Sequence, residues 1–250
     1  MKKVNLNNLA VLDVTTDVNT FLLESEPPEL PFDVASDLSY GDMMSSAKSS
    51  ACSFDTYREI VQISMYYAGQ CRNFIYCPSN TPSEVDGVSS YDTERALLAG
   101  FTDYLFSVYP ETESGTPMSD VVFAGWKIYS DVWPVIVNRA FSHGIDVPRS
   151  LLTDLTARFC TIEPFLDVST IYTQGILANL RKLPHPSEAL WMWNGTERKS
   201  VRFATPGRIR DYICTDTQKA VESINLMLIS MHEAVQRYYN VDKWRRNKGV

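Results

Sequence analysis

The stretch DYICTDTQKAVESINLMLISMHEAVQRYY, residues 211–239, predicts a long amphipathic helix that begins close to a Tyr-Asp pair. Residues 217–239 contain neither Gly nor Pro, and apolar side chains recur there at steps of three and four. Those side chains are Val221, Ile224, Leu228, Met231 and Val235. This spacing is the apolar stripe of a helix that packs by one face.

Tyr212 and Asp216 stand four residues apart at the start of this stretch. On a helix their side chains are neighbours, and they lie on a different face from the apolar stripe. A two-metal nuclease uses such a pair, because the Asp ligates a metal and the Tyr hydroxyl orients the attacking water. The structural alternative is an acidic residue near a helix N-terminus, where the helix dipole favours it.

Composition is that of an ordinary globular protein of 250 residues, with 44% hydrophobic and 21% charged residues. No apolar run approaches the roughly 18 residues of a membrane span, and the first residues lack a signal-peptide core, so we expect an intracellular, cytoplasmic protein without membrane contact. The five cysteines have no zinc-ligand spacing and predict reduced, mostly buried thiols. They are Cys52, Cys71, Cys77, Cys160 and Cys214.

The net charge is −7, and the charged residues are distributed unevenly along the chain. Residues 1–180 carry 10 Lys and Arg against 23 Asp and Glu, whereas residues 181–250 carry 13 against 7. The basic part predicts a surface for phosphates or for an acidic protein partner; solvated loops and a helix end that favours positive charge are the alternative. Its candidate binding residues, which include a basic tail at 241–250, are Arg198, Lys199, Arg202, Arg208, Arg210, Lys243, Trp244, Arg245 and Arg246.

Hydrophobic patterning predicts one α/β domain over residues 1–250 with a central mixed sheet of five strands flanked by helices. The strands are expected at 9–15, 60–67, 73–77, 121–126 and 165–168, with a hairpin through Gly69 and a long excursion at 24–56. The helices are expected at 95–108 with Asp92 as N-cap, at 130–143 with Ser130 or Asp131 as N-cap, at 171–183, at 187–193 and at 217–239. Alternation places Asp13 and Thr15 on one face of the first strand.

The order of these elements resembles the DEDDy-type 3′–5′ exonuclease family, which has the RNase H-like fold. The family's first motif is similar to Asp13-Val14-Thr15-Thr16, its second to Gly125–Pro134, and its third to Tyr212 and Asp216. The resemblance implies an RNase H-like domain with a remnant catalytic site at Asp13, Tyr212 and Asp216. It also implies that Asp13 and Asp216 lie close together.

Two of the family's four carboxylates are missing at the matching positions. Thr15 stands at the glutamate position, Lys127 at an asparagine position and Val132 at an aspartate position, with Asp131 directly before it. Four carboxylates balance two divalent ions roughly 3.5–4 Å apart, and two carboxylates do not. A one-residue slip would bring Asp131 into place, but one residue on an α-helix turns the side chain by about 100°. Metal binding by Asp13 and Asp216 is therefore expected to be weak or absent.

Two functions are compatible with these residues. The first is a catalytically degenerate exonuclease-fold protein that needs no cofactor and acts as a binding, adaptor or accessory protein, with a protein partner favoured and nucleic acid as the other partner class. It is similar to divergent phage-encoded exonuclease domains, which suggests a role in phage replication or in protein sorting within the infected cell. The alternative is an active 3′–5′ exonuclease on DNA or RNA that uses Mg²⁺ or Mn²⁺ in a rearranged site.

Overall fold

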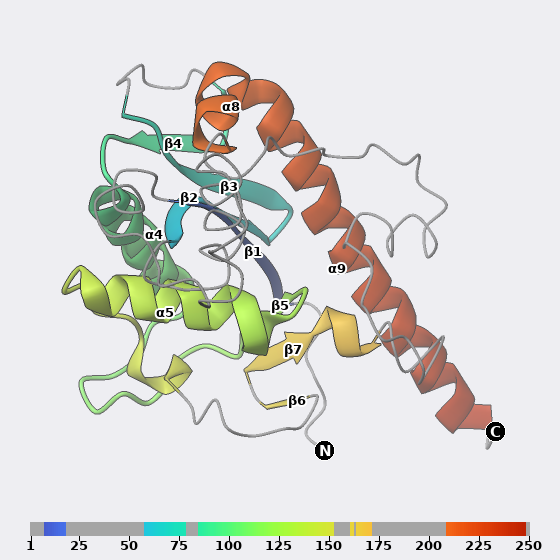
Figure 1. The fold of residues 1–250 in the computed structure, drawn as a ribbon. Helices are drawn as coiled ribbons and strands as arrows, with labels where there is room; N and C mark the ends of the chain where they lie inside the picture. Colours follow the sequence, from blue (N-terminus) through green and yellow to red (C-terminus); the bar gives the residue numbers. More distant parts are fainter. Residues whose placement is uncertain are drawn as a thin grey trace, which may run out of the picture.

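The computed structural model describes residues 8–18, 58–78, 85–152, 161–162, 164–171 and 209–248, with the backbone alone at 161–162 and 240–248. These residues form a seven-stranded mixed sheet with helices on both sides (Figure 1). The strand order is β4-β3-β2-β1-β5-β7-β6. The strands are β1 (Leu9–Val18), β2 (Arg58–Tyr67), β3 (Gln70–Tyr76), β4 (Val88–Tyr91), β5 (Val122–Gly125), β6 (Thr161–Ile162) and β7 (Phe165–Asp167).

The first three strands form an antiparallel unit at the centre of the sheet. The predicted hairpin between β2 and β3 is confirmed, and its two turn residues, Ala68 and Gly69, both have positive φ angles of 49° and 81°. Two positive φ angles in a two-residue loop match the right-handed twist of the flanking strands. A bulge interrupts the pairing of β1 with β2 between Thr15 and Thr16.

The other half of the sheet is mostly parallel, because β5 pairs parallel to β1 and β7 pairs parallel to β5. The prediction of five strands is wrong in number, since β4 adds a parallel strand beside β3 and β6 adds a short antiparallel strand beside β7. Ser89 and Ser90 give β4 no apolar alternation, and β6 has two residues, so neither produces a pattern of its own.

Helix α4 (Glu94–Val108) connects β4 to β5, and its N-cap is Thr93 rather than the predicted Asp92. The Thr93 side chain accepts a hydrogen bond from the backbone N–H of Ala96 at 3.1 Å, as N-cap residues do. The predicted helix at 130–143 is divided into η3 (Ile128–Val132), a π-helix, and α5 (Trp133–Ser142). Neither Ser130 nor Asp131 caps it, because the helical turn already begins at Ile128.

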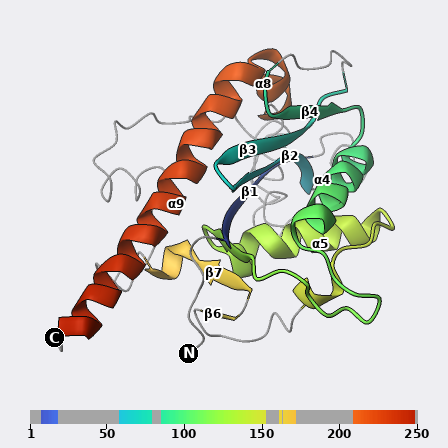
Figure 2. The same cartoon turned by 180° about the vertical axis from the view of Figure 1, so that it is seen from behind.

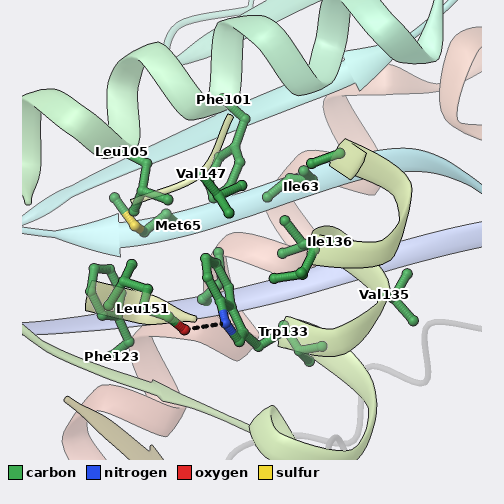
Figure 3. Close-up of a cluster of buried hydrophobic side chains, with 14 of the residues drawn as sticks. Ile63, Met65, Phe101, Leu105, Phe123, Trp133, Val135, Ile136, Val147 and Leu151 are labelled. Carbon is green, nitrogen blue, oxygen red and sulfur yellow. Dashed lines mark hydrogen bonds between the residues drawn. The ribbon is translucent and has the colours of Figure 1, made fainter. Parts of the chain in front are cut away.

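Two helical layers enclose the sheet, with α4 and α5 on one side and α9 (Thr217–Lys248) crossing the other (Figures 1 and 2). The core under α4 and α5 centres on Trp133, which is 1% exposed and donates its indole N–H to the carbonyl of Leu151 at 2.9 Å (Figure 3). Leu151 belongs to the short helix η4 (Arg149–Leu151). Alternate residues of β1 supply both cores: Ala10 and Leu12 face α4 and α5, whereas Val11 faces α9.

Helix α9 buries the predicted stripe, whose five residues are at most 2% exposed. It continues to Lys248, so the residues predicted as a basic tail form the last turns of this helix and extend beyond the sheet (Figure 1). A separate helix, α8 (Ile209–Thr215), precedes it. Within the described ranges, no helix has the length and apolarity needed to cross a membrane. The predicted excursion at 24–56 and most of the predicted helices at 171–183 and 187–193 lie outside the described residues.

Candidate functional site

Asp13 lies near the middle of β1, directly opposite Ser64 of β2. It shares its face of the strand with Val11, which packs against α9, and it remains partly exposed. Removal of the carboxylate from water raises the pKa of Asp13 from 3.8 to about 7. The negative charge of Asp131 adds to this increase, and a hydrogen bond from the backbone of Val14 opposes it. Asp13 therefore titrates near neutral pH, where its protonated and ionised forms are both populated.

The turn that follows β5 places the second carboxylate of the site. It begins at Gly125, where an added Cβ would lie 2.6 Å from the backbone oxygen of Leu12, so only glycine fits against β1. Lys127 then adopts a left-handed conformation, with φ of 55°, which is uncommon for a residue with a side chain. The buried carboxylate of Asp167 holds this residue in place by accepting its backbone N–H at 3.1 Å.

The carbonyl of Lys127 accepts backbone N–H groups from Ser130, Asp131 and Val132 at 3.2, 2.9 and 3.3 Å. This convergence opens η3, the π-helical turn. A π-helical turn inserts one residue relative to an α-helix, and such turns occur frequently at functional sites. The argument from α-helical rotation therefore does not apply to Asp131, because this segment is not α-helical.

Asp131 lies close enough to Asp13 for their charges to interact, and its carboxylate is 47% exposed. Its Oδ1 accepts a hydrogen bond from the guanidinium of Arg58 at 3.2 Å. Arg58 also donates to the hydroxyl of Thr16 through Nε and Nη2, at 3.2 and 3.1 Å. Val132, which stands at the aspartate position of the family's second motif, is instead 4% exposed within the core under α4 and α5.

Tyr212 and Asp216, the two residues of the third motif, lie in α8 and directly after it. Asp216 stands between α8 and α9 and is 47% exposed, with an ion pair to Lys219 at 3.9 Å. Tyr212 packs partly against a small core around Ile213. The acidic side chain whose charge acts on Asp13 comes from η3, so the expected closeness of Asp13 and Asp216 remains a prediction.

The donor atoms at this site do not fit a pair of divalent ions. Among the residues that the structure describes, no three His, Cys, Asp or Glu side chains are grouped so as to hold a metal ion. Thr15 supplies a hydroxyl where a carboxylate is needed, and Asp216 is engaged with a lysine. Divalent magnesium prefers octahedral oxygen ligands and binds through carboxylates. Asp13 and Asp131 alone provide at most a weak site for one ion.

A buried polar network extends from Asp13's neighbours toward α9, and sequence analysis did not detect it. Gln62, Ser64 and Asn73 are each 1% exposed. Gln62 donates to Ser64 at 3.0 Å, Ser64 donates to Asn73 at 2.7 Å, and Asn73 donates to Asn225 of α9 at 3.0 Å. Among the described residues, the buried Oε1 atom of Gln62 has no hydrogen-bond partner. Polar residues at alternate positions of a strand were the available signal for this network.

Arg210 was predicted to bind a partner, but its side chain forms an internal cluster. It donates to Glu59 at 2.6 Å and lies over the ring of Tyr76, 5.3 Å from its centroid. Its backbone N–H donates to Asp17 at 3.0 Å at the start of α8. Desolvation raises the pKa of Glu59, and the charge of Arg210 opposes the increase. Arg210 thus fixes α8 to the ends of β1 and β2.

A second charged cluster lies where α4 begins and α5 ends. Glu94 is 7% exposed and accepts hydrogen bonds from the backbone of Ile60 at 2.7 Å and from Nε of Arg139 at 2.8 Å. Its other oxygen contacts Nη2 of Arg139 and, at 2.9 Å, Nε2 of His143. Burial acts to raise the pKa of Glu94, but the hydrogen bonds to Arg139 and Ile60 outweigh it and lower the pKa.

Cys77 and Cys214 form a disulfide, with Cα atoms 5.6 Å apart, that joins the end of β3 to α8. The prediction of reduced thiols is therefore wrong for this pair. The two residues are 137 positions apart, and the pairing of an odd number of scattered cysteines cannot be derived from spacing. Cys71 is a free, partly buried thiol, and burial raises its pKa to about 11.

The remaining predicted binding residues fall into two groups. Residues Arg198, Lys199, Arg202 and Arg208 lie outside the described residues. Residues Lys243, Trp244, Arg245 and Arg246 belong to the last turns of α9. No protein-family model matches the chain, and no curated protein matches it in sequence.

Proposed function

We propose that this chain is an RNase H-like protein of the DEDDy exonuclease type whose site no longer supports two-metal catalysis, and that it acts by binding a protein partner. The order of elements supports the fold assignment. Apart from the edge strands β4 and β6 and two short helical turns, three antiparallel strands are followed by α4, β5, α5 and β7, and β1 lies at the centre with Asp13 on it. That is the order of elements on which the resemblance rests.

The arrangement around Asp131 carries the functional part of the proposal. Asp131 is the carboxylate brought close to Asp13, and a guanidinium occupies one of its oxygens at 3.2 Å. Asp13 itself carries its full negative charge only above neutral pH, since its pKa is about 7. Electrostatic stabilisation by bound ions is the main catalytic contribution in phosphoryl transfer. A site with one half-protonated carboxyl group and one carboxylate paired with arginine holds such ions weakly.

One observation favours the alternative of an active exonuclease. The π-helical turn brings an aspartate, Asp131, within charge range of Asp13, although Val132 stands at the matching motif position. π-helical turns and left-handed non-glycine residues such as Lys127 are both enriched at functional sites. An enzyme would still need a third and fourth carboxylate, and Asp216 is the remaining candidate in the third motif.

A nuclease assay separates these two functions. Purified protein is incubated with 5′-labelled single-stranded DNA and RNA and either Mg²⁺ or Mn²⁺, next to the variant Asp13→Asn. We expect no metal-dependent shortening from the 3′ end with either protein. Processive 3′ shortening that Asp13→Asn abolishes would reject the proposal and establish the enzyme. The asparagine variant controls for contaminating nucleases, because such activity would persist in it.

The class of partner is tested on the basic end of α9. If the partner is nucleic acid, log affinity should fall against log salt with a slope of roughly −0.9 per phosphate on duplex DNA and about −0.7 on single strands. We expect no such binding at low salt. Tight, salt-dependent binding that Lys243→Glu with Arg246→Glu weakens would replace the protein partner by a nucleic acid, because those charges lie on the last turns of α9.

A further inference from the structure

The first residue of β2, Arg58, connects three parts of the chain at the end of β1. Its backbone pairs with Val18, its Nε and Nη2 atoms donate to the hydroxyl of Thr16, and Nη2 also reaches Asp131. The arginine side chain is 18% exposed, whereas the Asp131 side chain is 47% exposed. The two bonds to the Thr16 hydroxyl anchor the guanidinium beside Asp131.

Arginine is a permanent cation, since its guanidinium group stays protonated at every pH at which proteins are usually studied. A divalent ion that approaches Asp131 therefore meets a fixed positive charge that already uses one carboxylate oxygen. The ion must share the carboxylate with that charge or displace it. Either route costs affinity, and the site has few other ligands to offset the loss, because Asp13 is the nearby carboxyl group.

We propose that Arg58 is the positioning residue that commits Asp131 to an internal ion pair and so excludes divalent cations from the site. This inference rests on the proposed function, because it names the contact that keeps the exonuclease-like site silent. It attributes weak metal binding to the positive charge of Arg58 as well as to the missing carboxylates. The ligand class concerned is a hard divalent cation such as Mn²⁺.

Direct measurement of Mn²⁺ binding tests the role of Arg58. Free Mn²⁺ is titrated by electron paramagnetic resonance with wild-type protein and with Arg58→Gln, which keeps hydrogen-bond donors but removes the charge. We expect about tenfold tighter binding in the variant, the effect of one unit charge on a doubly charged ion roughly 5 Å away in water. The double variant Arg58→Gln with Asp131→Asn should lose this gain.

Arg237→Gln is the matched control, since Arg237 also forms an ion pair, with Glu233 at 3.7 Å on the exposed side of α9. It should leave Mn²⁺ affinity within twofold of wild type. A structural role alone would change stability but not the affinity for the ion. Circular dichroism and thermal unfolding establish that each variant is folded. If Arg58→Gln does not fold, a second pair of variants replaces it. Arg58→Lys, which keeps the positive charge but loses the planar guanidinium, should then bind Mn²⁺ less tightly than Arg58→Met.

The outcomes separate this inference from the proposed function. If Arg58→Gln is folded and binds Mn²⁺ no better than wild type, the role of Arg58 is wrong while a silent site remains. If the gain persists in the double variant, the ion binds elsewhere and the inference also fails. If wild-type protein binds Mn²⁺ tightly and shortens DNA from the 3′ end, the proposed function is wrong, and the inference that rests on it is wrong as well.

Discussion

Replacement of Asp13 by asparagine should make the protein more stable at neutral and alkaline pH. The unfolded carboxyl has its ordinary pKa of 3.8, and the folded one has a pKa of about 7. Between these values the folded state binds a proton that the unfolded state does not, so stability falls as the pH rises through this window. The group stabilises the fold fully below pH 4, and this contribution is lost as the pH passes about 7.

The size of the effect follows from the shift. Each pKa unit corresponds to about 1.4 kcal/mol, so a shift of roughly three units gives at most about 4 kcal/mol between pH 4 and pH 8. Asp13 is partly exposed, which reduces the difference below that limit. Asparagine has the same shape and no charge at any pH. The variant should match wild type near pH 4 and exceed it at pH 8.

The assay is urea unfolding of both proteins at four pH values from 4.5 to 8.5, with the slope of each transition compared. Asp103→Asn, at an exposed position of α4, is the control and should change stability little at any pH. Carbon NMR of the Asp13 carboxyl gives its pKa directly. A variant that is less stable than wild type at pH 8, or a measured pKa below 5, would refute the argument from desolvation.

Three further substitutions test the contacts that hold the site in place. Cys214→Ser should lower the free energy of unfolding by about 3–5 kcal/mol, since it opens the 137-residue link to Cys77; an unchanged transition under reducing and oxidising conditions would contradict the disulfide. Glu94→Gln should cost roughly 3 kcal/mol, and the difference from wild type should shrink as the pH falls through the lowered pKa of Glu94. Gly125→Ala should cost about 2 kcal/mol in thermal unfolding, because its Cβ would collide with backbone.

Most of the sheet could be predicted because its strands carry their own signals. Short runs of mostly apolar residues located β1, β2 and β3, and Gly69 located the hairpin. The burial of Trp133 and of the α9 stripe also follows from pattern. The short edge strands β4 and β6 could not be predicted, since partners in the sheet and not their own residues define them.

The candidate site was predicted only in part, because its geometry depends on one irregular turn. Asp13 stood out as an acidic residue in an apolar strand, but the contribution of Asp131 depends on the π-helical turn after Lys127. That turn follows from tertiary contacts, such as the bond from Lys127 to Asp167, 40 residues away. The resemblance suggested Asp216 as the partner of Asp13, which stays a prediction, whereas the fold brings the charge of Asp131 within range of Asp13.

The carboxyl groups around the end of β1 are each compensated by the chain itself. Asp131 pairs with Arg58, and Asp17 accepts the backbone N–H of Arg210. Asp13, whose carboxyl group is desolvated and lies near the charge of Asp131, is compensated by a proton as the pH falls below about 7. In a two-metal enzyme the bound ions would provide this compensation. A site whose charges are already balanced by arginine, backbone and proton gains little from a cation, which is the physical basis for proposing that this protein works by binding.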